Sequence, residues 1–117
     1  MTTGYRIQSE NHGVTDLLDP ERQISLSYSG RDEDVRQGIS VCASLEDLAA
    51  YIAQTGIEID ASNSVVVVVE GPESEDLPCD AHLGELLIHP TRVVSVTPAD
   101  DTDIWDLVDA AYDRLYA

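Results

Sequence analysis

Five consecutive valines, Val65 to Val69, constrain the fold of this chain more than any other feature of the sequence. An unbroken apolar run of this length has no polar side, which is typical of a strand buried on both faces of a sheet. The run therefore predicts a central strand at 64–70. Val66 and Val68 are expected to be core residues.

A first amphipathic helix is predicted at 45–54 from the helical spacing of its apolar residues, which include Leu48 and Ile52. Ser44 precedes it as a favourable N-cap residue, and two acids stand in the first turn, where the helix dipole favours them. Gly56 is expected to end this helix.

A second helix is predicted at 103–115, beginning at Asp103. Its apolar stripe is expected to be buried, with three aspartates mostly toward water. The stripe consists of Ile104, Leu107, Val108, Ala111 and Leu115.

The other elements are predicted to be strands. Residues 24–28 alternate with a period of two and are compatible with a strand or with a turn of helix. Residues 29–36 and 71–81 are expected to be loops. Together the pattern predicts an α+β fold in a single domain, 1–117, with a twisted, mostly antiparallel sheet and two main helices. The further predicted strands lie at 4–8, 38–43, 84–89 and 92–97.

Charge is the most unusual part of the composition. Six Arg and no Lys stand against 23 acids, which gives a formal net charge of -17. Phosphate backbones and anionic membranes require many basic residues, so neither nucleic acid nor a membrane surface is an expected partner. Two explanations stay open: an acidic surface that binds a basic protein as a polyanion mimic does, or adaptation of the whole surface to salt or genome composition.

The sequence favours a cytoplasmic protein. Its two cysteines, Cys42 and Cys79, do not form a disulfide framework. No signal-peptide pattern opens the chain, and the longest apolar run is far too short to span a bilayer. Oligomeric state is not indicated by any sequence feature.

Common catalytic and metal-binding motifs are absent from the sequence. Cys79 and His82 are spaced as a metal-ligand pair, but a zinc site requires about four ligands, so no metal is expected. There is no G-x-S-x-G elbow, no Walker sequence and no G-x-G-x-x-G.

Three residues in ordered positions suggest a different chemistry. Tyr5-Arg6 lies on the first predicted strand, Gly38-Ile39-Ser40 opens a strand that runs into a helix, and Gly84-Glu85-Leu86 lies late in the chain. In this respect the sequence resembles the ADP-ribosyltransferase superfamily, in the branch built on an Arg, a Ser and a Glu. The helix with Tyr51 and the central strand ending in Glu70-Gly71 are also similar to that family. The resemblance covers residues 38–97 and the first strand.

The resemblance implies NAD as a substrate and a role for each of the three residues. Arg6 would contact the NAD phosphates, because a guanidinium can donate two parallel hydrogen bonds to a phosphate. Ser40 would support the nicotinamide pocket. Glu85 would be the catalytic residue, binding the nicotinamide ribose and stabilising the cation that develops on it.

The sequence departs from the family pattern at two motif positions, the chain is shorter than typical members, and the segment between Arg6 and Ser40 is compressed. The family's Ser-Thr-Ser stretch is Ser40-Val41-Cys42 in this chain. Leu83 stands where many members have a second Glu, which argues against transfer of ADP-ribose to an arginine side chain. Transfer to another acceptor, or hydrolysis of NAD, is therefore the expected reaction.

Overall fold

The structure is a computed structural model, and it describes residues 1–10, 13–25, 36–55, 63–78 and 81–116. Four predictions depend on residues outside these ranges. They are the extension of a strand to residue 28, the loop before residue 36, the helix stop at Gly56 and the metal-ligand pair that includes Cys79. The elements are β1 (Thr2–Ser9), η1 (Val14–Leu18), η2 (Pro20–Arg22), β2 (Ile24–Ser25), β3 (Arg36–Gln37), β4 (Ile39–Cys42), α1 (Leu45–Thr55), β5 (Ser64–Gly71), η5 (Ala81–Leu83), β6 (Glu85–Ile88), β7 (Arg92–Pro98), η6 (Ala99–Asp101) and α2 (Ile104–Tyr116).

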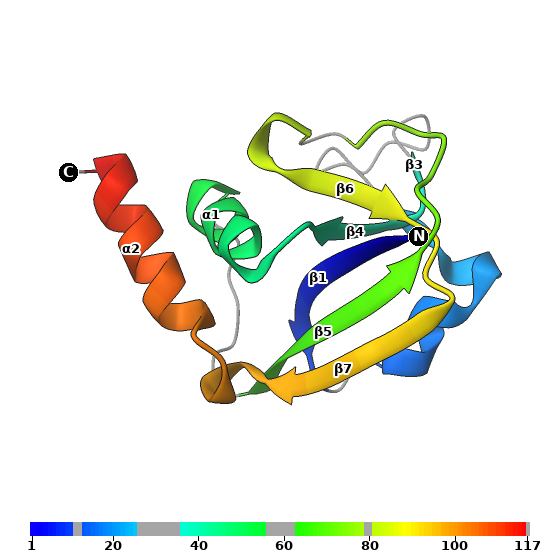
Figure 1. Cartoon of the computed structure of the whole chain (residues 1–117), viewed down its shortest axis with the longest axis horizontal. Helices are drawn as coiled ribbons and strands as arrows, with labels where there is room; N and C mark the ends of the chain where they lie inside the picture. The colour runs from blue at the N-terminus through cyan, green and yellow to red at the C-terminus, as the bar shows by residue number, and fades with distance from the viewer. Residues whose placement is uncertain (11–12, 26–35, 56–62, 79–80, 117) are drawn as a thin grey trace.

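The main sheet has five strands in the order β6-β4-β1-β5-β7, and every neighbouring pair is antiparallel (Figure 1). β2 and β3 form a separate two-stranded ribbon. Two helices accompany the sheet, so the predicted α+β class is confirmed. The predicted strands and both helices are confirmed within a few residues at each end.

β5 occupies an inner position in the sheet because its valines leave no face that tolerates water. It pairs with β1 along its whole length, from Ser64 opposite Ser9 to Gly71 opposite Thr2, and with β7 on its other side. The side chain of Val67 is fully buried, and so is that of Val69. An added Cβ at Gly71 would lie 2.0 Å from the carbonyl oxygen of His89, so only glycine allows this close approach of two backbones.

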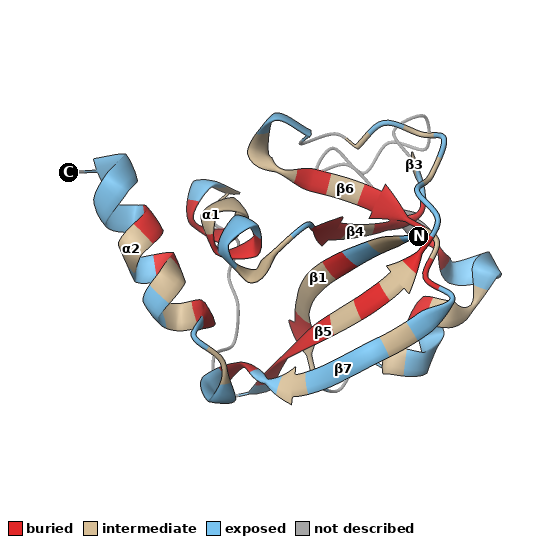
Figure 2. Cartoon of the chain, viewed as in Figure 1, coloured by how far each residue is buried: buried red, intermediate tan, exposed pale blue. Residues whose placement is uncertain are grey.

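Two clusters of buried side chains lie on the opposite faces of the sheet, since successive residues of a strand point to opposite sides. On one face, Cys42 and Val66 pack against α1 and α2. On the other face, Val41 and Val67 pack with Leu17 of η1. Figure 2 shows buried residues on β4, β5, β6 and both helices, whereas β7 is half-buried or exposed along its length.

The helices form where local sequence and packing agree. The Ser44 hydroxyl accepts a hydrogen bond of 3.0 Å from the backbone N–H of Asp47, which confirms Ser44 as the N-terminal cap of α1. α1 packs against α2 (Figure 1). Among the described residues, no helix combines the length and the apolar character needed to cross a membrane.

The predicted core is confirmed in part. Val66, Leu48, Ile52 and Ala111 are buried as expected. Val68 is only half-buried, because it lies further along β5 than Val66 and is not part of the cluster that contacts the helices.

The stripe predicted for the second helix also needs correction at two positions. Leu107 is half-buried and packs against the outside of the cluster that contains Cys42 and Val66. The side chain of Leu115 is 47% exposed, since the last turn of α2 projects beyond the sheet (Figure 1).

The strand predicted to begin at residue 84 begins one residue later. Residues Ala81–Leu83 form a 3₁₀ turn, and Gly84 has a φ of 97°, a backbone conformation that favours glycine. Gly84 therefore turns the chain immediately before Glu85, the first residue of β6.

Gln23 links the segment after η2 to the connection between β6 and β7 by hydrogen bonds. Its side-chain amide donates to the carbonyl oxygens of Leu17 (2.8 Å) and Pro90 (2.9 Å), and the side chain is buried. Since both amide hydrogens are used, its oxygen must accept at 3.0 Å from Nδ1–H of His89. The hydrogen bonds thus fix the tautomer of this histidine.

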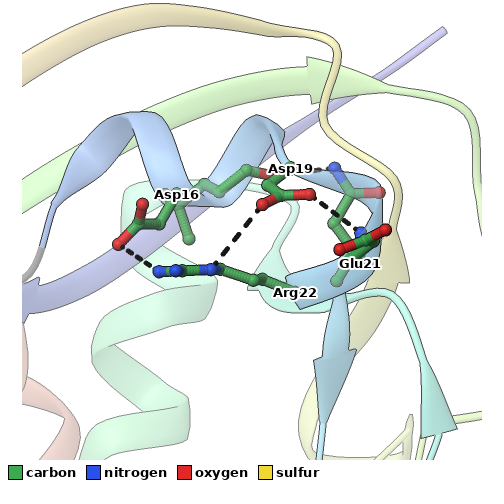
Figure 3. A network of polar contacts seen from close by, with 6 residues as sticks. Asp16, Asp19, Glu21 and Arg22 are labelled. Carbon is green, nitrogen blue, oxygen red and sulfur yellow. Dashed lines mark hydrogen bonds and ion pairs between the residues drawn. The ribbon is translucent and has the colours of Figure 1, made fainter.

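Few ion pairs balance the acidic surface. In the described part of the chain, Arg22 pairs with Asp16 and Asp19 at 3.0 and 3.6 Å (Figure 3), and Arg92 pairs with Glu70 at 3.4 Å. Figure 3 also shows the Asp19 carboxylate accepting from the backbone N–H of Glu21. Exposed pairs of this kind contribute only about 0–1 kcal/mol each.

Salt is therefore expected to stabilise the protein. Raising the ionic strength from about 0.01 M to about 0.1 M shortens the screening length from about 30 Å to about 10 Å and weakens repulsion among unpaired carboxylates. We expect the thermal midpoint, followed by circular dichroism at pH 7, to rise over this range. A midpoint that stays constant or falls would show that attractive pairs outweigh the repulsion.

Candidate functional site

Three neighbouring strands of the sheet carry the three residues selected from the sequence. Arg6 lies on β1, Ser40 on β4 and Glu85 at the start of β6, and β4 lies between the other two strands. Residues separated by up to 79 positions in the chain are thus brought to adjacent strands.

Ser40 and Glu85 are in direct contact. The Ser40 hydroxyl donates a hydrogen bond of 2.6 Å to Oε2 of Glu85. The geometry follows from the register: Ser40 lies opposite Leu87 and Cys42 opposite Glu85, so Ser40 and Glu85 are diagonal neighbours on one face of the sheet.

The Glu85 carboxylate is held from two sides. Its side chain is only 8% exposed. Tyr51 of α1 donates a longer hydrogen bond, 3.4 Å, to the same Oε2 atom that Ser40 contacts. A strand and a helix therefore both fix the position of one buried carboxylate, which restricts where its charge can act.

The side chain of Arg6 contacts the backbone of Ser40. Nη1 donates to the carbonyl oxygen of Ser40 at 3.2 Å, and Nε donates to the side-chain oxygen of Gln8 at 3.0 Å. Burial lowers the pKa of the Arg6 guanidinium from its ordinary value. Among the described residues, no carboxylate forms an ion pair with Arg6, so this arginine is not a surface counterion.

The side chain of Arg6 leaves the sheet on the face opposite that of Glu85. Tyr5 lies opposite Cys42, which lies opposite Glu85, so these three residues share the face that α1 covers. Arg6 is the next residue after Tyr5 and shares the other face with Gly4, where an added Cβ would lie 2.4 Å from the Val41 side chain. The structure thus brings Ser40 and Glu85 together on one face, and it links Arg6 to Ser40 only where β1 meets β4.

Two further residues, Gln8 and Tyr51, contact Arg6 and Glu85. Gln8 orients the guanidinium, and the i, i+2 spacing of Arg6 and Gln8 on a predicted strand was the available signal. Tyr51 was noted only as part of the resemblance. Its contact with Glu85 depends on how α1 packs on the sheet, for which the sequence contains no local signal.

Cys42 lies beside the carboxylate as an unreactive thiol. Burial, reinforced by the negative charges of Asp47 and Glu85, raises the pKa of Cys42 to about 12. A buried neutral thiol is a poor nucleophile and a poor metal ligand. In the part of the chain that the structure describes, no group of three or more potential ligands is arranged to hold a metal ion.

The raised pKa of Cys42 has a consequence for stability at alkaline pH. In the folded chain Cys42 keeps the proton that it loses in the unfolded chain above about pH 8.5. The resulting contribution to the free energy of unfolding is fully present below that pH and is lost as the pH rises toward 12. We expect wild type to lose up to about 1.4 kcal/mol more per pH unit than Cys42→Ala between pH 9 and 10.5. Urea unfolding of both proteins measures this, and equal slopes would contradict the assignment.

Comparison of the chain with protein-family models, with curated proteins and with solved structures finds no significant match.

Proposed function

We propose that this chain is a small ADP-ribosyltransferase-like protein that uses NAD, either transferring ADP-ribose or hydrolysing NAD. The observation that supports this best is the 2.6 Å hydrogen bond from Ser40 to Glu85. The resemblance implies that Ser40 supports the nicotinamide pocket and that Glu85 binds the nicotinamide ribose, two roles that require the residues to be neighbours. Since NAD is a cytoplasmic metabolite, we also propose that the chain acts in the cytoplasm.

Glu85 supplies the electrostatic part of this chemistry. The bond between the ribose C1′ and the nicotinamide nitrogen breaks, and nicotinamide leaves with the bonding electrons. Positive charge then develops on the ribose, and a fixed carboxylate lowers the energy of that state without being consumed. Water or an acceptor side chain next forms a bond to C1′ and loses a proton.

The resemblance assigns the diphosphate contact to Arg6. A guanidinium has five N–H donors, and the hydrogen bonds to Gln8 and Ser40 use two of them. A carboxylate on this guanidinium would compete with a phosphate, and none of the described carboxylates is paired with it. Arg6 leaves the sheet on the face opposite Glu85, so the proposal depends on Ser40 and Glu85, and the diphosphate role of Arg6 is only what the resemblance implies.

The test is release of nicotinamide from NAD, measured by chromatography. Wild type is expected to release nicotinamide, and Ser40→Ala to release it more slowly, since the carboxylate loses its shortest hydrogen bond. Ser95→Ala, which removes an exposed hydroxyl on β7, is the matched control and should match wild type. No release by correctly folded wild type, alone or with a cell extract as acceptor, would exclude the proposal.

A second candidate function has one specific observation in its favour. Six aspartates in and before α2 are exposed, and none of them forms an ion pair with a described residue. They would present a row of negative charge to a basic protein partner, as a polyanion mimic does. Binding to such a partner should weaken steeply with salt. The aspartates are Asp100, Asp101, Asp103, Asp106, Asp109 and Asp113.

The two candidate functions are separable by their variants. Neutralising Asp106, Asp109 and Asp113 together should abolish binding to a basic partner and leave nicotinamide release unchanged. Ser40→Ala should slow nicotinamide release and leave binding to a basic partner unchanged.

A further inference from the structure

β7 forms one end of the main sheet, and among the described strands only β5 pairs with it (Figure 1). This strand is exposed over most of its length (Figure 2). Val94 and Val96 are each 46% exposed. An edge strand with unpaired N–H and C=O groups and exposed valines tends to pair with another strand. The opposite edge differs, because β6 has only four residues and Glu73 bridges to Ile88 beside it.

Charge indicates what kind of strand would fit this edge. Residues 92–98 contain no carboxylate, although the chain has 23 acids. Arg92 stands at the first position of β7, and Asp100 and Asp101 follow Ala99 just beyond its end; all three charged residues are exposed. Antiparallel pairing of two such strands would place the Arg92 of each copy beside the two aspartates of the other. The edge is therefore complementary to itself.

The irregular part of β7 determines where pairing can occur. Val93 lies opposite Val69 and Ser95 opposite Val68, so Val94 is the additional residue of a bulge. η1 also contacts β7, and Val14 and Val93 pack against the same cluster. The regular part of the strand follows the bulge and includes Val96. A two-fold axis at Val96 would place Val96 against its own copy and Arg92 against Asp100 of the second copy.

We propose that two copies of this chain associate through the outer edges of β7, which joins their sheets into one antiparallel sheet across a two-fold axis. Isologous contacts of this kind use the same patch on both subunits. The net charge of -17 on each copy opposes association, and residues 92–98 add no negative charge to the contact. Moderate salt therefore strengthens the dimer, whereas it would weaken binding to a basic partner.

Sedimentation equilibrium of the full chain at about 0.15 M salt tests the proposal. We expect a monomer–dimer equilibrium whose dissociation constant rises at least tenfold in Val96→Glu, because two carboxylates then face each other on the axis. Leu115→Glu is the matched control, since Leu115 on α2 is 47% exposed and should leave the constant unchanged. Circular dichroism confirms that each variant is folded.

A charge exchange provides a second, independent test. Arg92→Glu should weaken the dimer, and combining it with Asp100→Arg and Asp101→Arg should restore it. A chain that stays monomeric at millimolar concentration would overturn the proposal. So would a dimer that Leu115→Glu dissociates and Val96→Glu does not, since the interface would then involve α2.

Discussion

Replacing Glu85 by glutamine is expected to lower the rate of nicotinamide release by a factor on the order of 10² to 10³, the loss typical of removing one preorganised electrostatic group from an active site. The amide has nearly the same shape as the carboxylate, and its oxygen can still accept the hydrogen bonds from Ser40 and Tyr51. The change therefore removes the charge that stabilises the ribosyl cation and leaves the packing intact. Initial rates at saturating NAD measure the effect.

Glu75→Gln is the control for this experiment. Glu75 is exposed on the acidic loop before η5, and the same change of charge there should leave the rate within about twofold of wild type, as expected for a surface charge outside the active site. If Glu85→Gln were as active as wild type, Glu85 would not be the catalytic residue. If both variants lost activity equally, the effect would arise from net charge.

Truncating Ile104 to alanine is expected to destabilise the fold by about 2–5 kcal/mol. Ile104 is the first residue of α2, its side chain is fully buried, and it belongs to the cluster that joins the helices to the sheet. Removing its outer carbons leaves a cavity between elements that cannot close over it without moving α2. Urea unfolding at pH 7 measures the loss.

Leu115→Ala on the same helix is the matched comparison. Both residues were expected in one apolar stripe, but Leu115 is 47% exposed, so its truncation should cost no more than about 0.5 kcal/mol. Similar losses for the two variants would mean that the end of α2 is packed against something, a second copy or a partner, and would contradict its exposure in the monomer.

Local features of the fold were predictable from the sequence because their causes are local. The five valines require burial on both faces, and β5 has neighbouring strands on both sides. Ser44 caps α1 through a contact three residues away. The spacing of Ile104, Val108 and Ala111 determines which face of α2 is buried, and all three residues are buried.

Features that depend on register or on packing between distant elements were not predictable. The adjacency of β1, β4 and β6 depends on pairing across dozens of residues. A shift of one residue in register changes the face of every side chain on a strand. The sequence therefore contains no indication that Arg6 and Glu85 leave the sheet on opposite faces. Likewise, the partial exposure of Val68 depends on where the helices lie along β5.

The central claim is that an NAD site is formed around Ser40 and Glu85, where β4 and β6 pair. Titration of the ¹⁵N-labelled chain with NAD, followed by heteronuclear NMR, tests it directly without requiring turnover. We expect saturable shifts of the backbone amides of Arg6, Ser40 and Glu85 and of their neighbours, with the amides of residues 100–113 unaffected. No shifts at millimolar NAD, or shifts confined to residues 100–113, would contradict the claim.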